Sequence, residues 1–313
     1  MTLLMDLSQA RTHYLNEIRL DGGAKNENVR RVLTTVPREH FYGPGPWRFA
    51  MRELNPNAGI SYLTTDDADP ASIYRNASIP LDESRQLLSG HPGLVARYLD
   101  QLDIQPGQHV LHLGSGTGYY TALLAELVGP GGRVDATEAD ARLAALAQAN
   151  LVDHPNVTVA HTNDTPCADG CADAILMSFG VTHIEPVWLN KLRDGGRLLV
   201  SLTVPIGPTQ GIGLLFKVTR EGSTFKTALL QPTAGFSGVG VRDAAMEQAL
   251  AQAMQTGAIT QVTEVRRDAH VPTSTCVLHR DGACLSRAST ALQPAPSLAA
   301  SVPSPQALSL MKF

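Results

Sequence analysis

The sequence predicts an α/β fold built on a doubly wound, mostly parallel sheet. Between residues 108 and 205, short apolar runs alternate with helix-like segments, which is the order that a parallel sheet covered on both faces requires. A glycine-rich turn, GSGTG at residues 114–118, joins the first apolar run to the first helix. The 313 residues, 43% hydrophobic and 17% charged, suit one large globular domain or two smaller ones.

Each element of this stretch has its own signal. The expected strands are HVLHLG, RVDATEAD, VTVAHTND, ADAILMSF and RLLVSLTV. The expected helices between them are YYTALLAELVG, which Gly129 ends, ADARLAALAQANLVDH, and PVWLNKLRDGG, which also ends in glycine.

The N-terminal part has a different pattern. Residues 5–36 are expected to be helical, with apolar residues at helical spacing up to Pro37. Residues 43–80 are rich in Pro, Gly, Asn and Asp, which predicts irregular structure. A further helix is expected to begin at Pro92, because proline suits a first helical turn and an apolar face follows it.

The C-terminal part adds a second pattern to the parallel core. IGLLFKVTR and FKTALLQP predict a hairpin, DAAMEQALAQAMQTG an amphipathic helix, and CVLHRDGACLS a strand, turn and strand. We therefore expect a helical and irregular substrate or lid region at 1–90, a ligand-binding core at 91–211 and a C-terminal region completing or extending the core at 212–286. The Ser/Ala/Pro-rich residues 287–313 are expected to be a disordered tail.

Composition argues against several classes of partner. The formal charge is −4 and no run of Lys and Arg is present, so a nucleic-acid partner is not expected. No apolar stretch approaches the length of a membrane span, and the N-terminus has no cleavable apolar segment, so a cytoplasmic location is expected by default.

The four cysteines do not predict a metal site. Cys167, Cys171, Cys276 and Cys284 lack a matching pair at metal-ligand spacing, so free buried thiols are expected and no metal is predicted.

The glycine-rich turn predicts a ligand site at the start of a helix. Gly114, Gly116 and Gly118 allow a sharp bend and a close approach of a ligand, and the helix amides that follow face it. A dinucleotide-binding turn has its third glycine at the position that Tyr119 takes here. The GxGxG spacing therefore suits a ligand without a pyrophosphate. Ser115 and Thr117 complete the turn and are included in the expected site.

Polar residues after the next two strands complete this pattern. Glu138 lies 20 residues after Gly118, where an acidic side chain can accept both hydroxyls of a ribose. Asn163 and Asp164 follow the third strand and can reach an adenine edge, while Asp140 is expected to cap the next helix and leave Glu138 free. Together these turns predict a pocket for S-adenosyl-L-methionine.

Longer matches support this prediction. The segments VRRVLTTVPREHF, IYRNASIPL, VLHLGSGTGYYTALLAELVGPGGRV and WLNKLRDGGRLLVSL resemble those of the protein-L-isoaspartate O-methyltransferase family, over roughly residues 27–205. The resemblance implies a Rossmann-like class I methyltransferase fold with a seven-stranded sheet. It also implies a methyl acceptor that is a carboxylate of a peptide or protein.

One departure from the family bears on the acceptor. The family has a hydroxyl residue two positions before a proline in its substrate loop, whereas here Gly90 takes that position before Pro92 and Ser89 lies one residue earlier. Residues that are expected to orient or deprotonate the acceptor are Ser89, His91, Thr182 and His183.

Three functions fit these observations. The first is methylation of a peptide or protein carboxylate. The second is an enzyme of specialised metabolism that methylates a small molecule, or uses the cofactor without methyl transfer. The third is a non-catalytic module that only binds the cofactor. An open acceptor cavity beside the methyl group would distinguish the first two from the third.

Overall fold

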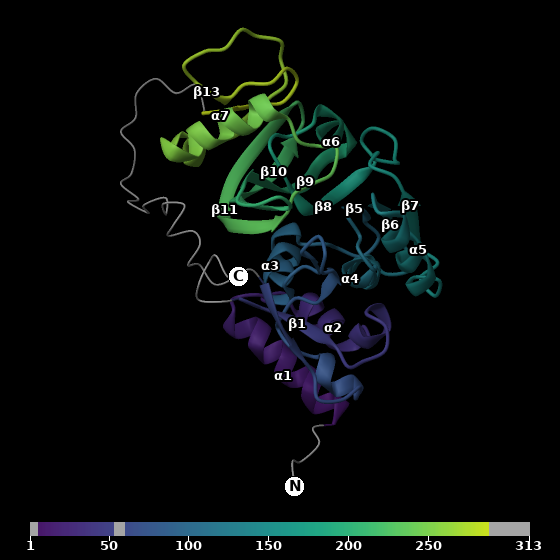
Figure 1. The fold of residues 1–313 in the computed structure, drawn as a ribbon. Helices are drawn as coiled ribbons and strands as arrows, with labels where there is room; N and C mark the ends of the chain where they lie inside the picture. Colours follow the sequence, from purple (N-terminus) through teal and green to yellow (C-terminus); the bar gives the residue numbers. More distant parts are fainter. Residues whose placement is uncertain (1–5, 53–59, 288–313) are drawn as a thin grey trace. The chain divides into compact units, whose positions relative to one another are not determined.

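The computed structural model describes residues 6–52 and 60–287, which belong to two compact units (Figure 1). The first unit comprises residues 1–167 and 174–178, and the second comprises 168–173 and 179–313. The boundaries expected from the sequence, after residues 90, 211 and 286, differ from these. Apart from Arg287, the expected disordered tail lies outside the described residues.

The first unit begins with two helices where one long helical stretch was expected. Helix α1 (Leu7–Leu20) starts with a capping box between Asp6 and Gln9, and α2 (Glu27–Thr35) starts at the capping residue Asn26. The chain between them turns through Gly22, whose φ of 80° is readily adopted only by glycine. The buried residues of α2 are Val29, Val32 and Leu33, so the predicted periodicity is confirmed.

The segment that was expected to be irregular contains short strands. Strand β1 (Arg48–Arg52) pairs with β2 (Ile60–Thr64), and β3 (Pro80–Asp82) pairs with β4 (Leu87–Leu88), both antiparallel. Two 3₁₀ turns, η1 (Arg38–Phe41) and η2 (Pro70–Ile73), connect to these strands. Helix α3 (Pro92–Leu102) begins with proline in its first turn, as predicted.

The parallel core follows in the predicted order. Its elements are β5 (His109–Leu113), α4 (Tyr119–Val128), β6 (Arg133–Glu138), α5 (Ala141–Asn150), β7 (Val157–His161) and β8 (Ala172–Val181). The strands lie in the order β7-β6-β5-β8, and every neighbouring pair is parallel. The carboxyl ends of β5 and β6 therefore lie side by side, which is where this kind of sheet holds its ligands.

The second unit is built on antiparallel strands. After α6 (Pro186–Lys191) come β9 (Leu192–Pro205), β10 (Gln210–Glu221), β11 (Thr224–Phe236), α7 (Ala244–Gln255), η3 (Ala258–Gln261), β12 (Glu264–Arg266), β13 (Cys276–Leu278) and β14 (Cys284–Ser286). Strands β9, β10 and β11 run side by side (Figure 1). Strands β12, β14 and β13 follow them in the same sheet. Helix α6 is shorter than expected, because the chain becomes extended at Leu192 and continues into β9.

These elements confirm the predicted α/β fold with a mostly parallel core. In chain order, β5–β11 supply the seven expected strands, and β12–β14 add a small antiparallel extension. In the described part of the chain, no helix combines the length and the apolar character that a bilayer span requires.

The cysteines differ from the expectation of four free buried thiols. Cys167 and Cys171 are disulfide-bonded, and neither is buried. A turn between them, in which the amide of Cys171 donates to the carbonyl of Ala168 at 3.3 Å, reverses the chain after β7. Cys276 and Cys284 are free thiols, and Cys284 is buried.

A buried histidine in β5 makes the first unit sensitive to acid. His112 is fully buried, and its ring nitrogens lie 2.8 Å from the hydroxyls of Thr121 and Ser178. Burial lowers the pKa of His112 from 6.5 to about 3. The unfolded chain therefore takes up a proton below pH 6.5 that the folded chain does not, so this stability is present above pH 6.5 and is lost as the pH falls towards 3.

We expect this one residue to remove about 2 kcal/mol of unfolding free energy between pH 6.5 and 5, at about 1.4 kcal/mol for each pH unit. Urea unfolding of the wild type and of His112→Asn at both pH values measures this contribution. The variant should lose less stability over the interval. Equal losses in the two proteins would show that His112 is not the group that titrates.

Candidate active site

The glycine-rich turn between β5 and α4 adopts backbone conformations that favour glycine at three positions. Gly114, Gly116 and Gly118 have φ values of 84°, 57° and 96°. The amides of Gly114 and Ser115 both donate to the carbonyl of Thr137 at the end of β6, each at 2.9 Å. The turn is thus held against the carboxyl end of the neighbouring strand.

Glu138 is fixed at this turn by backbone amides. Its carboxylate accepts from the amide of Gly116 at 2.8 Å and from the amide of Asp140 at 3.0 Å. Asp140 caps α5 by accepting from Arg142 and Leu143, each at 3.0 Å, which confirms the predicted cap. Since a carboxylate has about four acceptor sites, both oxygens of Glu138 retain capacity for hydroxyl donors.

Other polar groups at the same edge fit an adenosyl ligand to different degrees. The hydroxyl of Ser115 is buried and has no hydrogen-bond partner among the described residues, so it is available to a ligand. Thr117 is also buried, and its carbonyl accepts from the side chain of Asn150 at 2.9 Å. Asn163 and Asp164 lie exposed beyond the end of β7, where they can reach a ligand from the outer side.

A short hairpin covers the glycine turn. Arg142 of α5 donates to the carbonyl of Leu81 in β3 at 2.8 Å, and Arg85 bridges Asp82 and Asp140 at 2.8 and 2.6 Å. A Cβ atom on Gly116 would lie 3.2 Å from the side chain of Leu81. The hairpin β3–β4 is therefore attached over the turn, and no sequence pattern pointed to it, because its two strands are very short.

Ser89 lies just before α3 and is already hydrogen-bonded. Its hydroxyl accepts from the amide of Ile79 at 2.9 Å, and its own amide donates to the carbonyl of Ile79 at 2.7 Å. The side chain is 8% exposed. Ser89 therefore ties together the two ends of the segment that carries the hairpin, and it is not the cap of α3.

His91 is the capping residue of α3, but its side chain makes no capping hydrogen bond. Its Nδ1 atom lies 3.8 Å from the carboxylate of Asp21. Burial lowers the pKa of His91, and the attraction of Asp21 opposes this only in part. The ring is therefore more readily neutral near pH 7 than an exposed histidine.

Thr182 and His183 follow β8 and belong to the second unit. Both side chains are buried. The hydroxyl of Thr182 lies 2.8 Å from Nδ1 of His183, whose Nε2 lies 2.7 Å from the carboxylate of Glu185. Arg280 in turn donates to both oxygens of Glu185, at 3.0 and 2.9 Å. These groups form a connected polar network within the second unit.

A sequence profile matches well over half of the chain. The family described as protein-L-isoaspartate(D-aspartate) O-methyltransferase (PCMT) matches residues 9–233, which include the glycine turn, Glu138 and the hairpin β3–β4. The chain belongs to this family. It is accordingly a methyltransferase that depends on S-adenosyl-L-methionine, and the family's description names a protein acceptor.

Curated relatives carry the same family name at modest identity. A protein-L-isoaspartate O-methyltransferase of Aeropyrum pernix is 34% identical over 143 residues, which span 46% of this chain and 45% of the relative. Those of Pyrobaculum neutrophilum and Aliivibrio salmonicida are 27% and 26% identical, over 66% and 72% of this chain and 88% and 94% of their own lengths.

Solved structures agree with the fold. One protein-L-isoaspartate O-methyltransferase aligns over 78% of this chain and 69% of its own, with a TM-score of 0.55 and 18% identity. A Plasmodium falciparum protein described as a beta-aspartate methyltransferase, solved with S-adenosyl-L-homocysteine, aligns over 73% and 97%, with a TM-score of 0.54 and 16% identity.

This PCMT-family chain also contains a buried arginine that the sequence analysis did not single out. Arg38 of η1 is fully buried, and its guanidinium donates to the carbonyls of Ile73 at 3.1 Å, of Ala77 at 2.8 Å and of Arg75. Aromatic rings surround it, with centroid distances from 5.2 to 6.0 Å; these are the rings of Tyr14, Tyr42, Phe49 and Tyr119. Arg38 thereby fixes the segment before β3. Its position in the VPREHF motif, which resembles the family, is the feature of the sequence that could have pointed to it.

Tyr74 belongs to the same cluster. Its ring packs edge-on against Tyr14 at 5.7 Å, and its hydroxyl donates to Glu39 at 2.6 Å. Tyr74 is buried, so its role in the described structure is packing.

The PCMT-family chain has a structural reason for glycine at position 90. A Cβ atom there would lie 2.7 Å from the side chain of Val95 and 3.0 Å from the ring of Tyr120. The hydroxyl of Tyr120 donates to the carbonyl of Gly90, which brings that ring close. A side chain at position 90 would thus collide with Val95 and Tyr120.

We expect Gly90→Ser to destabilise the protein by about 1–3 kcal/mol, because the added atoms overpack this contact. Thermal unfolding of the variant measures the effect. The double variant Gly90→Ser with Val95→Ala should recover part of the loss, since it removes the nearer of the two obstacles. A single variant as stable as the wild type would contradict the crowding described here.

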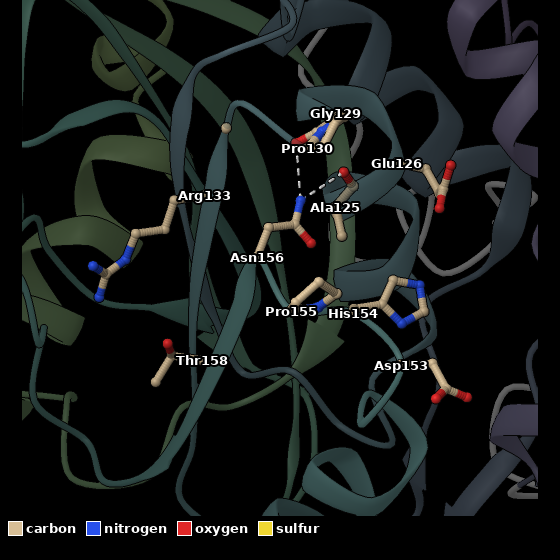
Figure 2. A pocket seen from close by; sticks show the side chains of 11 residues that line it. Ala125, Glu126, Gly129, Pro130, Arg133, Asp153, His154, Pro155, Asn156 and Thr158 are labelled. Carbon is tan, nitrogen blue, oxygen red and sulfur yellow. Dashed lines mark hydrogen bonds between the residues drawn. The ribbon is translucent and has the colours of Figure 1, made fainter.

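A separate pocket lies at the opposite edge of the parallel strands. The pocket has a volume of about 530 Å³. Figure 2 shows its lining around the start of β6 and β7 and the end of α4. Asn156 crosses it and donates to the carbonyls of Ala125 and Gly129 at 3.2 and 3.0 Å. Because ligands of such sheets bind beyond the carboxyl ends of the strands, this pocket is not the expected cofactor site.

Proposed function

We propose that this methyltransferase esterifies the free α-carboxylate of an isoaspartyl residue, or the side-chain carboxylate of a D-aspartyl residue, in a peptide or protein. The family match supports this acceptor, because the description of the matching family names protein L-isoaspartate and D-aspartate. The observation that carries the proposed site is the position of Glu138, which backbone amides hold at the glycine turn.

The proposed cofactor site uses the residues at the carboxyl ends of β5, β6 and β7. Glu138 accepts the two ribose hydroxyls, and Asn163 and Asp164 contact the adenine edge. The turn formed by Gly114, Ser115, Gly116, Thr117 and Gly118 lies along the amino-acid part of the cofactor. The unpartnered hydroxyl of Ser115 is a hydrogen-bonding group that such a ligand would satisfy.

The acceptor chemistry requires alignment more than proton transfer. The cofactor supplies an electrophilic methyl group on a positively charged sulfur. A carboxylate acceptor is already ionised at pH 7, so the protein has to orient it in line and exclude water. The hairpin β3–β4 over the glycine turn supplies part of this shielding.

Four residues are proposed to orient the acceptor. Ser89 and His91 are the stronger candidates, because they flank Gly90 at the position of the family's substrate loop. In addition, His91 has a ring nitrogen without a hydrogen bond among the described residues. Thr182 and His183 come second, because their polar atoms already bond within the second unit.

A second candidate function follows from the glycine at position 90. Position 90 has no side chain and is crowded by Val95 and Tyr120, so it cannot offer the acceptor the hydroxyl that the family's substrate loop carries there. A small metabolite that is methylated at the same cofactor site is therefore the alternative.

The cytoplasmic location stays a prediction.

The test is a transfer assay with S-adenosyl-L-methionine that carries a radiolabelled methyl group. The acceptors are an isoaspartyl peptide and a peptide of the same sequence with normal aspartate. We expect base-labile label on the isoaspartyl peptide alone, because methyl esters hydrolyse in base. Label on neither peptide, with the cofactor bound, would reject the proposal and favour a small-molecule acceptor.

A further inference from the structure

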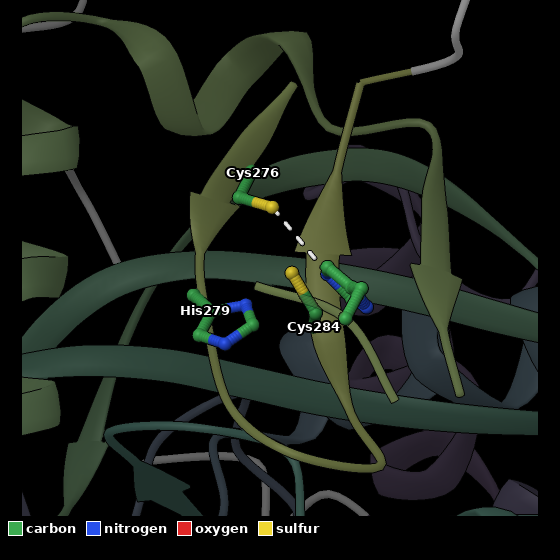
Figure 3. Close-up of side chains that lie close together, drawn as sticks. Cys276, His279 and Cys284 are labelled. Atoms are coloured by element: carbon green, nitrogen blue, oxygen red, sulfur yellow. Dashed lines mark hydrogen bonds between the residues drawn. The ribbon is translucent and has the colours of Figure 1, made fainter. Parts of the chain in front are cut away.

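Four potential metal ligands converge at the C-terminal end of the second unit. His270, Cys276, His279 and Cys284 each offer one ligand atom, and these four atoms all lie within 4.8 Å of one another. Figure 3 shows Cys276 on β13, Cys284 on the adjacent strand β14 and His279 just beyond β13, with their side chains turned towards a common centre.

The strand pairing explains how residues so spaced in the sequence meet. Cys276 pairs with Ser286 on β14, and Cys284 lies two residues from Ser286 on the same strand, so the two cysteines lie on neighbouring strands. The turn that contains Gly282, with a φ of 72°, returns the chain from His279 to Cys284. Residues 267–275, which have no helix or strand, bring His270 back to the same point.

The spacing is close to that of a tetrahedral zinc site. Bond lengths of about 2.3 Å to sulfur and 2.0–2.1 Å to nitrogen place neighbouring ligand atoms about 3.3–3.8 Å apart. Cys276 Sγ and His270 Nε2 are already 3.5 Å apart. The remaining ligand atoms need to move inwards by no more than about 1.5 Å to match this tetrahedral spacing.

Hydrogen bonds around the cluster orient three of the ligands. The carbonyl of Asp268 lies 2.8 Å from Nδ1 of His270, and because a carbonyl only accepts, Nδ1 carries the proton and Nε2 keeps its lone pair. The amide of Thr273 donates to the sulfur of Cys276 at 3.3 Å, and the hydroxyl of Ser286 lies 3.4 Å from the sulfur of Cys284. Such outer contacts are usual around metal ligands.

His279 offers a second, separate feature that suits a bound ion. Its Nδ1 atom is buried and has no hydrogen-bond partner among the described residues. Its ring lies edge-on to that of His270, with centroids 4.9 Å apart. A metal ion between the two rings would satisfy this buried nitrogen, which otherwise carries a desolvation cost.

We propose that His270 Nε2, Cys276 Sγ, His279 Nδ1 and Cys284 Sγ bind one Zn²⁺ ion in a structural site. Two thiolates and two imidazoles in tetrahedral arrangement favour zinc, and four protein ligands leave no open position for catalysis. The ion joins the short hairpin β13–β14 to the irregular segment 267–275. No metal was expected from the sequence, because the ligands H-x5-C-x2-H-x4-C do not form the usual CxxC pairs.

The test begins with the full-length chain, expressed with zinc and purified under reducing conditions without chelators. We expect about one zinc ion per chain by elemental analysis. After removal of the metal, Co²⁺ should give the visible absorption of a tetrahedral site together with a thiolate charge-transfer band. Zn²⁺ should displace it and raise the melting temperature.

Two variants separate the site from non-specific binding. Cys276→Ser should weaken Zn²⁺ binding at least about a hundredfold, since loss of outer-shell contacts alone costs about 10- to 100-fold. His13→Ala removes an exposed histidine of α1 and should bind zinc as the wild type does. The far-ultraviolet circular dichroism spectrum of each variant, compared with that of the wild type, reports that it has folded.

Two outcomes would overturn the proposal. One is a folded wild-type chain that contains no stoichiometric zinc and gives no tetrahedral Co²⁺ spectrum. The other is a disulfide between Cys276 and Cys284, found by mass spectrometry in the chain as purified under reducing conditions, because bonded sulfurs cannot serve as thiolate ligands.

Discussion

Glu138→Ala is expected to weaken the binding of S-adenosyl-L-homocysteine about a hundredfold or more. The carboxylate of Glu138 is held by the amides of Gly116 and Asp140 at the carboxyl end of β6, where it can accept both ribose hydroxyls. Hydrogen bonds to a charged group contribute about 1.5–3 kcal/mol each, and each 1.4 kcal/mol is tenfold in affinity. Isothermal titration calorimetry measures the change.

The matched control is Glu126→Ala, which removes an acidic side chain from α4 that faces Arg31 at 3.8 Å. It should bind the ligand as the wild type does. The melting temperature of each ligand-free variant shows whether the turn has loosened. Unchanged affinity in a folded Glu138→Ala protein would exclude Glu138 from the ribose site.

Arg38→Met is expected to destabilise the first unit by about 3 kcal/mol, because a fully buried guanidinium that bonds one buried and two partly buried carbonyls is lost, and an unsatisfied buried acceptor costs about 1–3 kcal/mol. These are the carbonyls of Ile73, Arg75 and Ala77. At about 2–4 °C for each kcal/mol, the melting temperature should fall by roughly 6–12 °C. Near-ultraviolet circular dichroism follows the loss, because tyrosine rings surround this site.

Arg31→Met on the neighbouring helix α2 is the control, because that arginine is half-exposed and its ion pair with Glu126 is weak. Its melting temperature should stay close to that of the wild type. If the melting temperature of Arg38→Met also equals that of the wild type, the buried guanidinium does not hold the segment before β3 as described.

The parallel core and the glycine turn could be predicted from the sequence because their signals are local. A buried strand, three glycines and a helix lie within 20 residues. Asp140 is a capping residue and so indicates where α5 begins. Glu138 could be placed at the same edge because parallel strands end together.

Contacts between distant segments could not be predicted in this way. Arg38 reaches carbonyls at residues 73–77, and Arg85 reaches Asp140 from a hairpin of only a few paired residues. The cluster of His270 with Cys276, His279 and Cys284 depends on the pairing of β13 with β14 and on the path of residues 267–275. Periodicity carries no information on such long-range pairings, because each depends on how several elements pack.

Hydrogen exchange with and without S-adenosyl-L-homocysteine tests most directly where the cofactor binds. The ligand should slow exchange of the amides at residues 114–118 and 138–141, which form the turn and the start of α5. Protection confined to residues 125–133 and 153–158, around the pocket in Figure 2, would place the ligand at the opposite edge of the strands and contradict the proposed site.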